Sequence, residues 1–183
     1  FLAAAGLPLS LAMCPLTTCQ DRRNTRSPKR MIFRVFVLLA VLFVTLSLGL
    51  AQAPTHANVP YGPHEKQVLD FWQAKSEAAK TPLLFFVHGG GWMTGDKANP
   101  DFLAKCLENG ISVVSINYRL IQDAQAAKID PPVKACLDDS ARALQFVRSQ
   151  AEAWKIDKER IAGCGGSAGG FTVLWLAFSP DMA

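Results

Sequence analysis

Short apolar runs alternate with helical patterns from residue 66 onwards, and this alternation limits the fold more than any other feature of the chain. Four runs are predicted as strands: QVLDFW (67–72), PLLFFV (82–87), ISVVSINY (111–118) and RIAGC (160–164). A helical pattern follows each of the last three. Strands that alternate with helices pair in parallel through right-handed crossovers. We therefore expect an α/β fold, a mostly parallel sheet with helices on both faces and with its chemistry at the carboxyl ends of the strands.

Three segments are predicted as helices. NPDFLAKCLENG (99–110) ends at a glycine, which is a helix stop signal. The second helix opens with a proline pair (131–132), and apolar residues then recur at steps of three or four across 133–151, which indicates one buried stripe. GFTVLWLAF (170–178) is apolar all round and is expected to be buried. APTHANVPYGP (53–63) is interpreted as a linker into the domain.

A G-x-S-x-G pattern, formed by Gly165, Ser167 and Gly169, lies between a predicted strand and a predicted helix. This is the context of a nucleophile elbow, a tight bend that exposes a serine. The bend strains the serine backbone and leaves no room for side chains two residues away on either side, so glycine is needed there. The following helix would point its N-terminus, with unpaired N–H groups, at the reaction site. Ser167 is therefore the candidate nucleophile.

A second glycine motif, HGGGW (88–92), directly follows the apolar run 82–87, which suits a strand buried on both faces. Its glycines leave backbone N–H groups unpaired at the end of a strand, and an oxyanion is stabilised by such groups. Because the carboxyl ends of parallel strands meet at one edge of a sheet, the loop and the elbow are expected to lie together. Trp92 could border an acyl pocket or simply pack, and the sequence leaves both open.

The segments FFVHGGGW, INYRL and IDKERIAGCGGSAGG, in that order, resemble those of a known family. They are similar to the α/β-hydrolase esterases and lipases with an H-G-G-G oxyanion loop, the hormone-sensitive-lipase-like group and its bacterial esterase relatives. The resemblance covers about residues 66–178. It implies Ser167 as the nucleophile, the N–H groups of Gly90, Gly91 and Ala168 as the oxyanion hole, Gly89 as the residue that lets the loop turn, and His88 as a support of that loop and not the base.

Two features depart from that family. RLIQDA follows Tyr118 where many relatives carry RLAPE, so the local loop is expected to differ. In this fold the triad acid and histidine follow the serine along the chain, yet all three histidines precede Ser167 and the one acid after it is Asp181. We therefore expect an N-terminal part of a hydrolase domain, truncated after the nucleophile helix and inactive alone, with the triad acid and histidine beyond residue 183.

Two other interpretations stay open. Gly163, Gly165 and Ala168 also fit the dinucleotide fingerprint G-x-G-x-x-A, although that pattern gives no reason for HGGGW. The chain could also be a hydrolase-like module that binds ligands without turnover. A P-loop is excluded because no lysine follows the glycines. We favour a serine hydrolase that cleaves small or medium carboxylic esters through an acyl-enzyme on Ser167, without a metal or organic cofactor.

Residues 31–53 have the three parts of a secretory signal peptide. Arg34 supplies the positive charge, residues 35–50 are apolar, and Ala51 and Ala53 give an A-x-A ending. The apolar run is shorter than the roughly 20 residues of a membrane span. We expect cleavage after Ala51 or Ala53 and export, secreted or periplasmic, with an uncleaved membrane anchor as the alternative. Residues 1–30 are then an upstream non-native or unstructured segment, and 54–183 belong to the hydrolase domain.

The formal charge of +4 does not indicate a nucleic-acid partner. Six of the 19 basic residues but one of the 15 acidic residues lie in residues 1–53, so the rest of the chain is close to neutral. The cysteines past the leader (106, 136 and 164) lack metal-like spacing, and we interpret them as small buried hydrophobes, with one disulfide left open. The expected partner is a small-molecule ester, without a metal site and without stable membrane insertion after cleavage. The oligomeric state is not indicated.

Three acids outside the motifs are expected to be structural. Asp138 and Asp139 lie in the middle of the predicted helix and are interpreted as solvated or hydrogen-bonding side chains. Asp157, three residues before Arg160, is interpreted as a turn or cap acid, and Cys164, at a strand end, as core filling and not as a nucleophile.

Overall fold

The computed structural model describes residues 52–98 and 100–179, all within one compact unit, Gly49–Ala183. The upstream segment 1–30 and the expected signal peptide 31–53, except for its last two residues, lie outside the described residues. Asp181 lies outside them as well.

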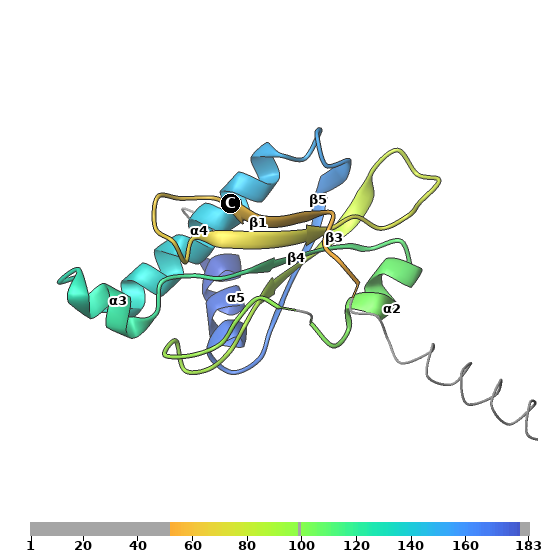
Figure 1. The fold of residues 1–183 in the computed structure, drawn as a ribbon. Coiled ribbons are helices and arrows are strands. Elements are labelled where there is room, and N and C mark those ends of the chain that lie inside the picture. The colour runs from red at the N-terminus through yellow and green to blue at the C-terminus, as the bar shows by residue number, and fades with distance from the viewer. Residues whose placement is uncertain (1–51, 99, 180–183) are drawn as a thin grey trace, which may run out of the picture. The chain divides into compact units, whose positions relative to one another are not determined.

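Five strands form one mixed sheet in the order β1-β2-β4-β3-β5 (Figure 1). The strands are β1 (His56–Pro60), β2 (Val68–Trp72), β3 (Thr81–Val87), β4 (Ser112–Ile116) and β5 (Ile156–Gly165). β3 pairs in parallel with β4 and β5, whereas β1 and β2 are antiparallel to their neighbours. Val87, at the end of β3, pairs with Gly165, at the end of β5. This register brings the starts of the two glycine motifs to one edge of the sheet.

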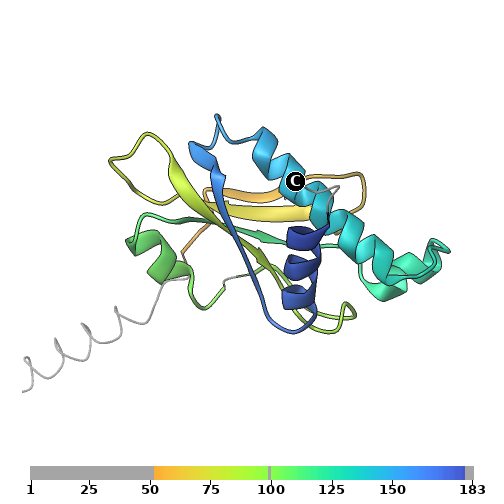
Figure 2. The ribbon, with the colours of Figure 1, turned by 180° about the vertical axis from the view of Figure 1, so that it is seen from behind.

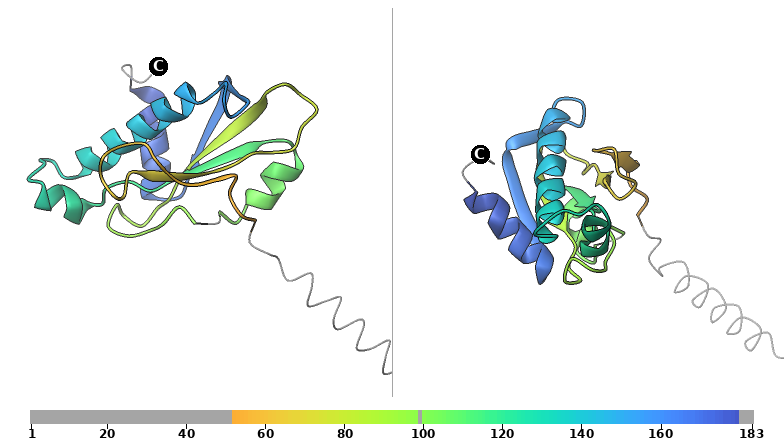
Figure 3. Two further views of the ribbon diagram at one scale, coloured as in Figure 1. Left: turned by 45° about the horizontal axis from the view of Figure 1, so that its top comes forward. Right: turned by 90° about the vertical axis from the view of Figure 1, so that its left-hand side faces the viewer.

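Four helices are described: α2 (Leu103–Glu108), α3 (Ile121–Ala126), α4 (Val133–Ser149) and α5 (Ala168–Phe178). α4 and α5 share one face of the sheet, where Val147 and Leu176 join the same core as Phe85 of β3. α2 covers the opposite face, where Leu103 packs with Trp72. Figures 2 and 3 show α4 lying across the sheet and α5 beside β5. The expected α/β architecture with helices on both faces is confirmed.

The segment interpreted as a linker instead contains an edge strand, β1. The backbone N–H of Asn58 donates to Asp70 Oδ1 at 2.7 Å, and the His56 ring stacks on that of Trp154 with centroids 5.6 Å apart. These are contacts with residues far along the chain, and the register of β1 on β2 is irregular. Tertiary contacts therefore stabilise this strand, whose sequence has no alternation of apolar and polar residues that would predict it.

The departure from the family pattern after Tyr118 forms the short helix α3, which the sequence did not predict. Its Asp123 carboxylate accepts a hydrogen bond from the backbone N–H of Leu120 at 2.8 Å and one from Lys66 Nζ at 2.7 Å. The first bond caps the N-terminus of the helix and the second ties it to the segment before β2. In this chain the segment that departs from the family pattern is therefore a short, capped helix.

α5 was expected to be buried all round, and this is wrong for the described residues. Thr172 and Leu176 are buried against the sheet, but Phe171, Leu174 and Phe178 are 53%, 59% and 81% exposed. Among the described elements α5 contacts β5, β3 and α4, all on its inner side. On the outer side Phe171 packs on the Trp92 ring, whereas Leu174 and Phe178 are largely exposed.

Two adjacent acids on α4 have opposite roles. Asp139 is fully buried and accepts two hydrogen bonds from the Arg119 guanidinium, at 2.6 and 2.9 Å, and one from Gln67 Nε2 at 2.6 Å. This network ties the end of β4 and the start of β2 to α4. Asp138 is exposed and pairs with Lys134, one helical turn earlier. The expectation of hydrogen-bonding and solvated roles is confirmed.

Candidate active site

The turn between β5 and α5 holds Ser167 in a strained conformation. Its φ of 52° and ψ of −119° lie outside the regions that ordinary residues occupy. The side chain is exposed, and the residue directly precedes the first residue of α5. A non-glycine residue in such a conformation persists only where the surrounding structure enforces it, and such residues cluster at functional sites.

The glycines two residues before and after Ser167 leave no space for side chains. A Cβ at Gly165 would lie 2.6 Å from the Val87 carbonyl oxygen, and a Cβ at Gly169 would lie 2.8 Å from the His88 carbonyl oxygen. Both distances are far below van der Waals contact. Strand β3 therefore packs directly against the turn, and any larger residue at either position would push it away.

The H-G-G-G loop lies against this turn. A Cβ on Gly89 would be 2.7 Å from the Gly166 carbonyl oxygen and 3.7 Å from Ser167 Cβ. The Gly90 carbonyl accepts hydrogen bonds from the N–H groups of Met93 and Thr94, at 3.0 and 3.1 Å, which closes the loop. Gly90 has a φ of 97°, which only glycine adopts without strain. The two glycine motifs, separated by more than 70 residues in sequence, are thus adjacent in space.

Three N–H groups at this junction are unpaired. Within residues 52–98 and 100–179, no acceptor binds the N–H of Gly90, Gly91 or Ala168. Gly90 and Gly91 are exposed, and Ala168 is the first residue of α5, so its N–H lies at the positive end of the helix dipole. These donors suit a developing negative charge on a bound carbonyl oxygen.

His88, the first residue of the H-G-G-G loop, is buried. Its ring stacks on Tyr118 with centroids 4.3 Å apart, and its Nδ1 is 2.9 Å from the Gly89 carbonyl oxygen. The Tyr118 hydroxyl donates to the His88 carbonyl at 2.8 Å. Burial lowers the pKa of the imidazole, against the opposing effects of the Gly89 carbonyl and of the Asp96 carboxylate. Burial therefore favours the neutral form of the ring, which contacts Tyr118 and the Gly89 carbonyl.

The side chains of the other two described histidines make contacts away from Ser167. His56 stacks on Phe71 and Trp154, and His64 Nδ1 accepts a hydrogen bond from the backbone N–H of Lys66 at 3.2 Å. In the part of the chain that the structure describes, no histidine or carboxylate is hydrogen-bonded to Ser167. The described residues therefore supply a candidate nucleophile and candidate oxyanion donors, without a general base.

Thr172 is a residue of this region that sequence reasoning missed. It is 1% exposed, and its hydroxyl accepts a hydrogen bond from Trp92 Nε1 at 3.1 Å and donates to the Ala168 carbonyl at 2.9 Å. Its spacing of four residues from Ala168 could have placed it on the inner face of the helix. The contact with Trp92 spans 80 residues and has no local signal. Trp92 is half-buried and also packs edge-to-face on Phe171.

Gly163, the first residue of the possible dinucleotide fingerprint, has a packing role. Gly163 lies inside β5, paired with Phe85 of β3, and a Cβ there would collide with Val173 of α5. Its lack of a side chain is needed for the close approach of helix and strand. Asp157 accepts hydrogen bonds from the Glu159 N–H and from Arg160 Nε, so its role is local as expected, but it lies within β5 and not in a turn or helix cap.

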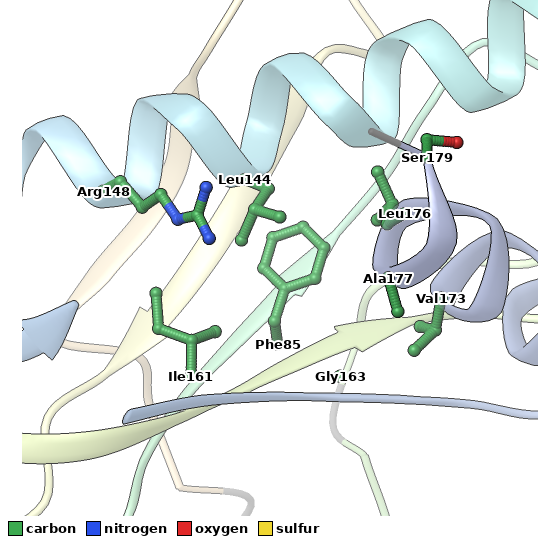
Figure 4. A pocket seen from close by; sticks show the side chains of 9 residues that line it. All are labelled: Phe85, Leu144, Arg148, Ile161, Gly163, Val173, Leu176, Ala177 and Ser179. Atoms are coloured by element: carbon green, nitrogen blue, oxygen red, sulfur yellow. The ribbon is translucent and has the colours of Figure 1, made fainter. Parts of the chain in front are cut away.

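An apolar cavity of about 210 Å³ lies apart from this site, between α4, α5 and β5 (Figure 4). Leu144 and Arg148 of α4 face Phe85 and Ile161, while Val173, Leu176 and Ala177 of α5 close the other side. Its lining includes neither Ser167 nor any residue of the H-G-G-G loop.

Within the described ranges, no cluster of three or more histidine, cysteine, aspartate or glutamate side chains could hold a metal ion. The three described cysteines are free; Cys136 is buried, as expected, but Cys106 and Cys164 are only half-buried. None of the described helices has the length and apolar character to span a membrane.

Curated proteins similar to this chain include several that are named esterases. It is 32% identical over 108 residues to the versiconal hemiacetal acetate esterase of Dothistroma septosporum, covering 58% of this chain and 31% of that protein. It is 37% identical over 91 residues to the carboxylesterase NlhH of Mycobacterium tuberculosis, covering 49% and 26%. The chain spans only 15% to 31% of the length of such curated relatives.

Solved structures and a family model agree with these relatives. A truncated carbohydrate esterase from gut microbiota matches with a TM-score of 0.58 and 26% identity, covering 68% of this chain and 46% of that one. Esterase B from Lactobacillus rhamnosis matches with a TM-score of 0.60 over 85% of this chain and 52% of its own, at 20% identity, which shows the fold alone. The model of the BD-FAE family matches residues 69–182. This chain therefore belongs to the BD-FAE family of α/β-hydrolase esterases.

Proposed function

We propose that the full-length protein hydrolyses carboxylic esters and that Ser167 is its nucleophile. The observation that carries this proposal is the junction of the two glycine motifs. There an exposed serine is held at a φ of 52°, beside a loop whose Gly89 packs against it. Membership in an esterase family and the esterase names of the similar proteins support the reaction class.

In the proposed reaction, Ser167 Oγ attacks the carbonyl carbon of the ester and loses its proton to a general base. The carbonyl oxygen becomes an oxyanion, which the N–H groups of Gly90, Gly91 and Ala168 stabilise. The C–O bond to the alcohol then breaks, the alcohol takes up the proton, and water hydrolyses the acyl-enzyme to release the acid. The general base in this proposal is a histidine outside the described residues.

The proposed substrates are esters of small or medium acyl groups. The similar proteins include an acetate esterase and a carbohydrate esterase by name. A test panel should therefore combine p-nitrophenyl acetate and butyrate with acetylated sugars. Release of acid from at least one of them is the expected result.

The direct test compares the full-length protein with its Ser167→Ala variant. We expect the variant to retain less than about 1% of the p-nitrophenyl butyrate hydrolysis, because loss of a triad member usually costs several orders of magnitude. A thermal melt of both proteins checks that the variant is folded. A folded Ser167→Ala protein with substantial activity would assign the nucleophile to another residue, and a folded wild type that hydrolyses no ester would argue for a non-catalytic binding module.

A further inference from the structure

A chain of hydrogen bonds connects the H-G-G-G loop to the nucleophile helix. Trp92, which directly follows Gly91, donates its Nε1–H to the Thr172 hydroxyl at 3.1 Å. That hydroxyl donates in turn to the Ala168 carbonyl at 2.9 Å. The chain thus runs from the residue next to one proposed oxyanion donor to the residue that carries another.

Both ends of this connection are fixed by further contacts. The Trp92 carbonyl accepts the N–H of Ile121 at 2.8 Å, and the Trp92 backbone is in the left-handed region with a φ of 58°. The Trp92 ring packs edge-to-face on Phe171 of α5 with centroids 5.6 Å apart. At the other end, Thr172 is 1% exposed on the inner face of α5. A buried hydroxyl with both partners satisfied is held in one orientation.

The arrangement matters because the proposed oxyanion donors come from two separate segments. Gly90 and Gly91 belong to the exposed loop, whereas Ala168 belongs to α5. The donors can act on one oxygen only if the two segments keep their relative position to within a fraction of an ångström. The packing of Gly89 against Gly166 and Ser167 fixes the loop relative to the turn before α5. The hydrogen bonds from Trp92 through Thr172 to Ala168 fix the loop relative to α5 itself.

We propose that Thr172, together with Trp92, is a positioning residue that holds the H-G-G-G loop at the correct distance from the N-terminus of α5. This inference rests on the proposed esterase function, and it assigns a role to a residue outside both glycine motifs. Thr172 does not touch the substrate; it acts through the loop. Its removal should therefore lower kcat more than it changes KM.

The test uses the full-length protein with Thr172→Val, which keeps the side-chain shape and removes the hydroxyl, and Thr172→Ser, which keeps the hydroxyl. We expect Thr172→Val to lower kcat by roughly 10- to 100-fold, since small misplacements at a reaction centre have effects of this size. KM for p-nitrophenyl butyrate should stay within about threefold, and Thr172→Ser should restore most of kcat. Hydrogen exchange of residues 88–95, followed by mass spectrometry, should be faster in Thr172→Val.

Ser140→Ala is the matched control. Ser140 is equally buried, and its hydroxyl donates to the carbonyl four residues earlier, that of Cys136, at 2.8 Å, but it lies on α4. It should lower stability without changing kcat or the exchange of 88–95. Trp92→Phe removes the donor of the hydrogen bond to Thr172 from its half-buried side. In the double variant with Thr172→Val the two losses of kcat should not add, because both substitutions remove the same hydrogen bond.

The outcomes separate this inference from the proposed function. A wild type without Ser167-dependent hydrolysis refutes the function, and the exchange of residues 88–95 still decides whether Thr172 holds the loop. With an active wild type, unchanged kcat in a folded Thr172→Val protein refutes the positioning role. Additive losses in the double variant refute it as well. If Thr172→Val does not fold, a Trp92→Phe protein with wild-type kcat and wild-type exchange refutes the positioning role instead.

Discussion

Replacing Gly90 by alanine is expected to slow ester hydrolysis far more than it destabilises the protein. Gly90 has a φ of 97°, outside the narrow left-handed region open to alanine. A Cβ there would collide with the carbonyl oxygen of Thr94 and lie 2.7 Å from its carbonyl carbon. The loop is exposed and can shift to relieve the clash, but the shift moves the N–H groups of Gly90 and Gly91. Loss of one oxyanion donor costs about 10²- to 10³-fold in kcat.

Alanine variants of two further glycines distinguish the displacement of the oxyanion donors from the effect of backbone strain alone. Gly110 has a φ of 71° and nothing within 4 Å of an added Cβ, so Gly110→Ala should cost about 1 to 2 kcal/mol of stability and leave kcat unchanged. Gly91, with a φ of 62° and its nearest contact at 3.7 Å, can accept a Cβ in place. Gly91→Ala should therefore lose less kcat than Gly90→Ala.

The assay measures kcat and KM for p-nitrophenyl butyrate, with thermal melts of all three variants of the full-length protein. A Gly90→Ala enzyme with wild-type kcat would remove Gly90 from the oxyanion hole. A loss of kcat in Gly110→Ala as large as that in Gly90→Ala would show that strain, and not donor position, governs turnover.

Three other predictions follow from particular contacts. Asp139→Ala should cost about 3 to 5 kcal/mol in urea unfolding, because it leaves the half-buried Arg119 guanidinium and the buried Gln67 amide without their acceptor. Asp138→Ala, at an exposed pair, should cost about 0.5 kcal/mol or less; similar costs would contradict the buried network. The folded pKa of His88 lies below its unfolded value, so the unfolded state binds more protons and stability should fall as the pH drops below about 6.5; a His88→Gln protein with the same pH dependence between pH 7 and 5 would refute this. We propose export with cleavage just before Gln52, because the Gln52 carbonyl accepts Trp72 Nε1–H at 2.7 Å; a mature chain that begins at Pro54, found by N-terminal sequencing, would contradict it.

The parts of the fold that the sequence could predict are those with a strong local pattern. The hydrophobic pattern of the sequence predicted strand β3 and the buried apolar face of helix α4 directly. Both glycine motifs were located by their position after a strand, and the structure brings them together through the pairing of Val87 with Gly165. The roles proposed for their residues remain predictions, since they concern a reaction and not a position.

The features that the sequence could not predict depend on partners distant in the chain. β1 is held by Asp70 and by Trp154, and nothing in HANVP itself indicates a strand. α3 begins where Asp123 caps it and Lys66 anchors it, in a segment identified only as a departure from a family pattern. The role proposed for Thr172 depends on its hydrogen bond with the Trp92 side chain, 80 residues earlier. Periodicity reports which face of an element is apolar, but not which residue will meet it.

The central claim, that Ser167 is the nucleophile, is tested most directly by covalent labelling. The full-length protein is incubated with a fluorophosphonate, which forms a bond between the serine oxygen and phosphorus with loss of fluoride, and its peptides are then mapped by mass spectrometry. The account predicts a single label on Ser167 and a loss of esterase activity in proportion to its occupancy. A label on another residue that tracks the loss of activity, or full activity with Ser167 completely labelled, would contradict it.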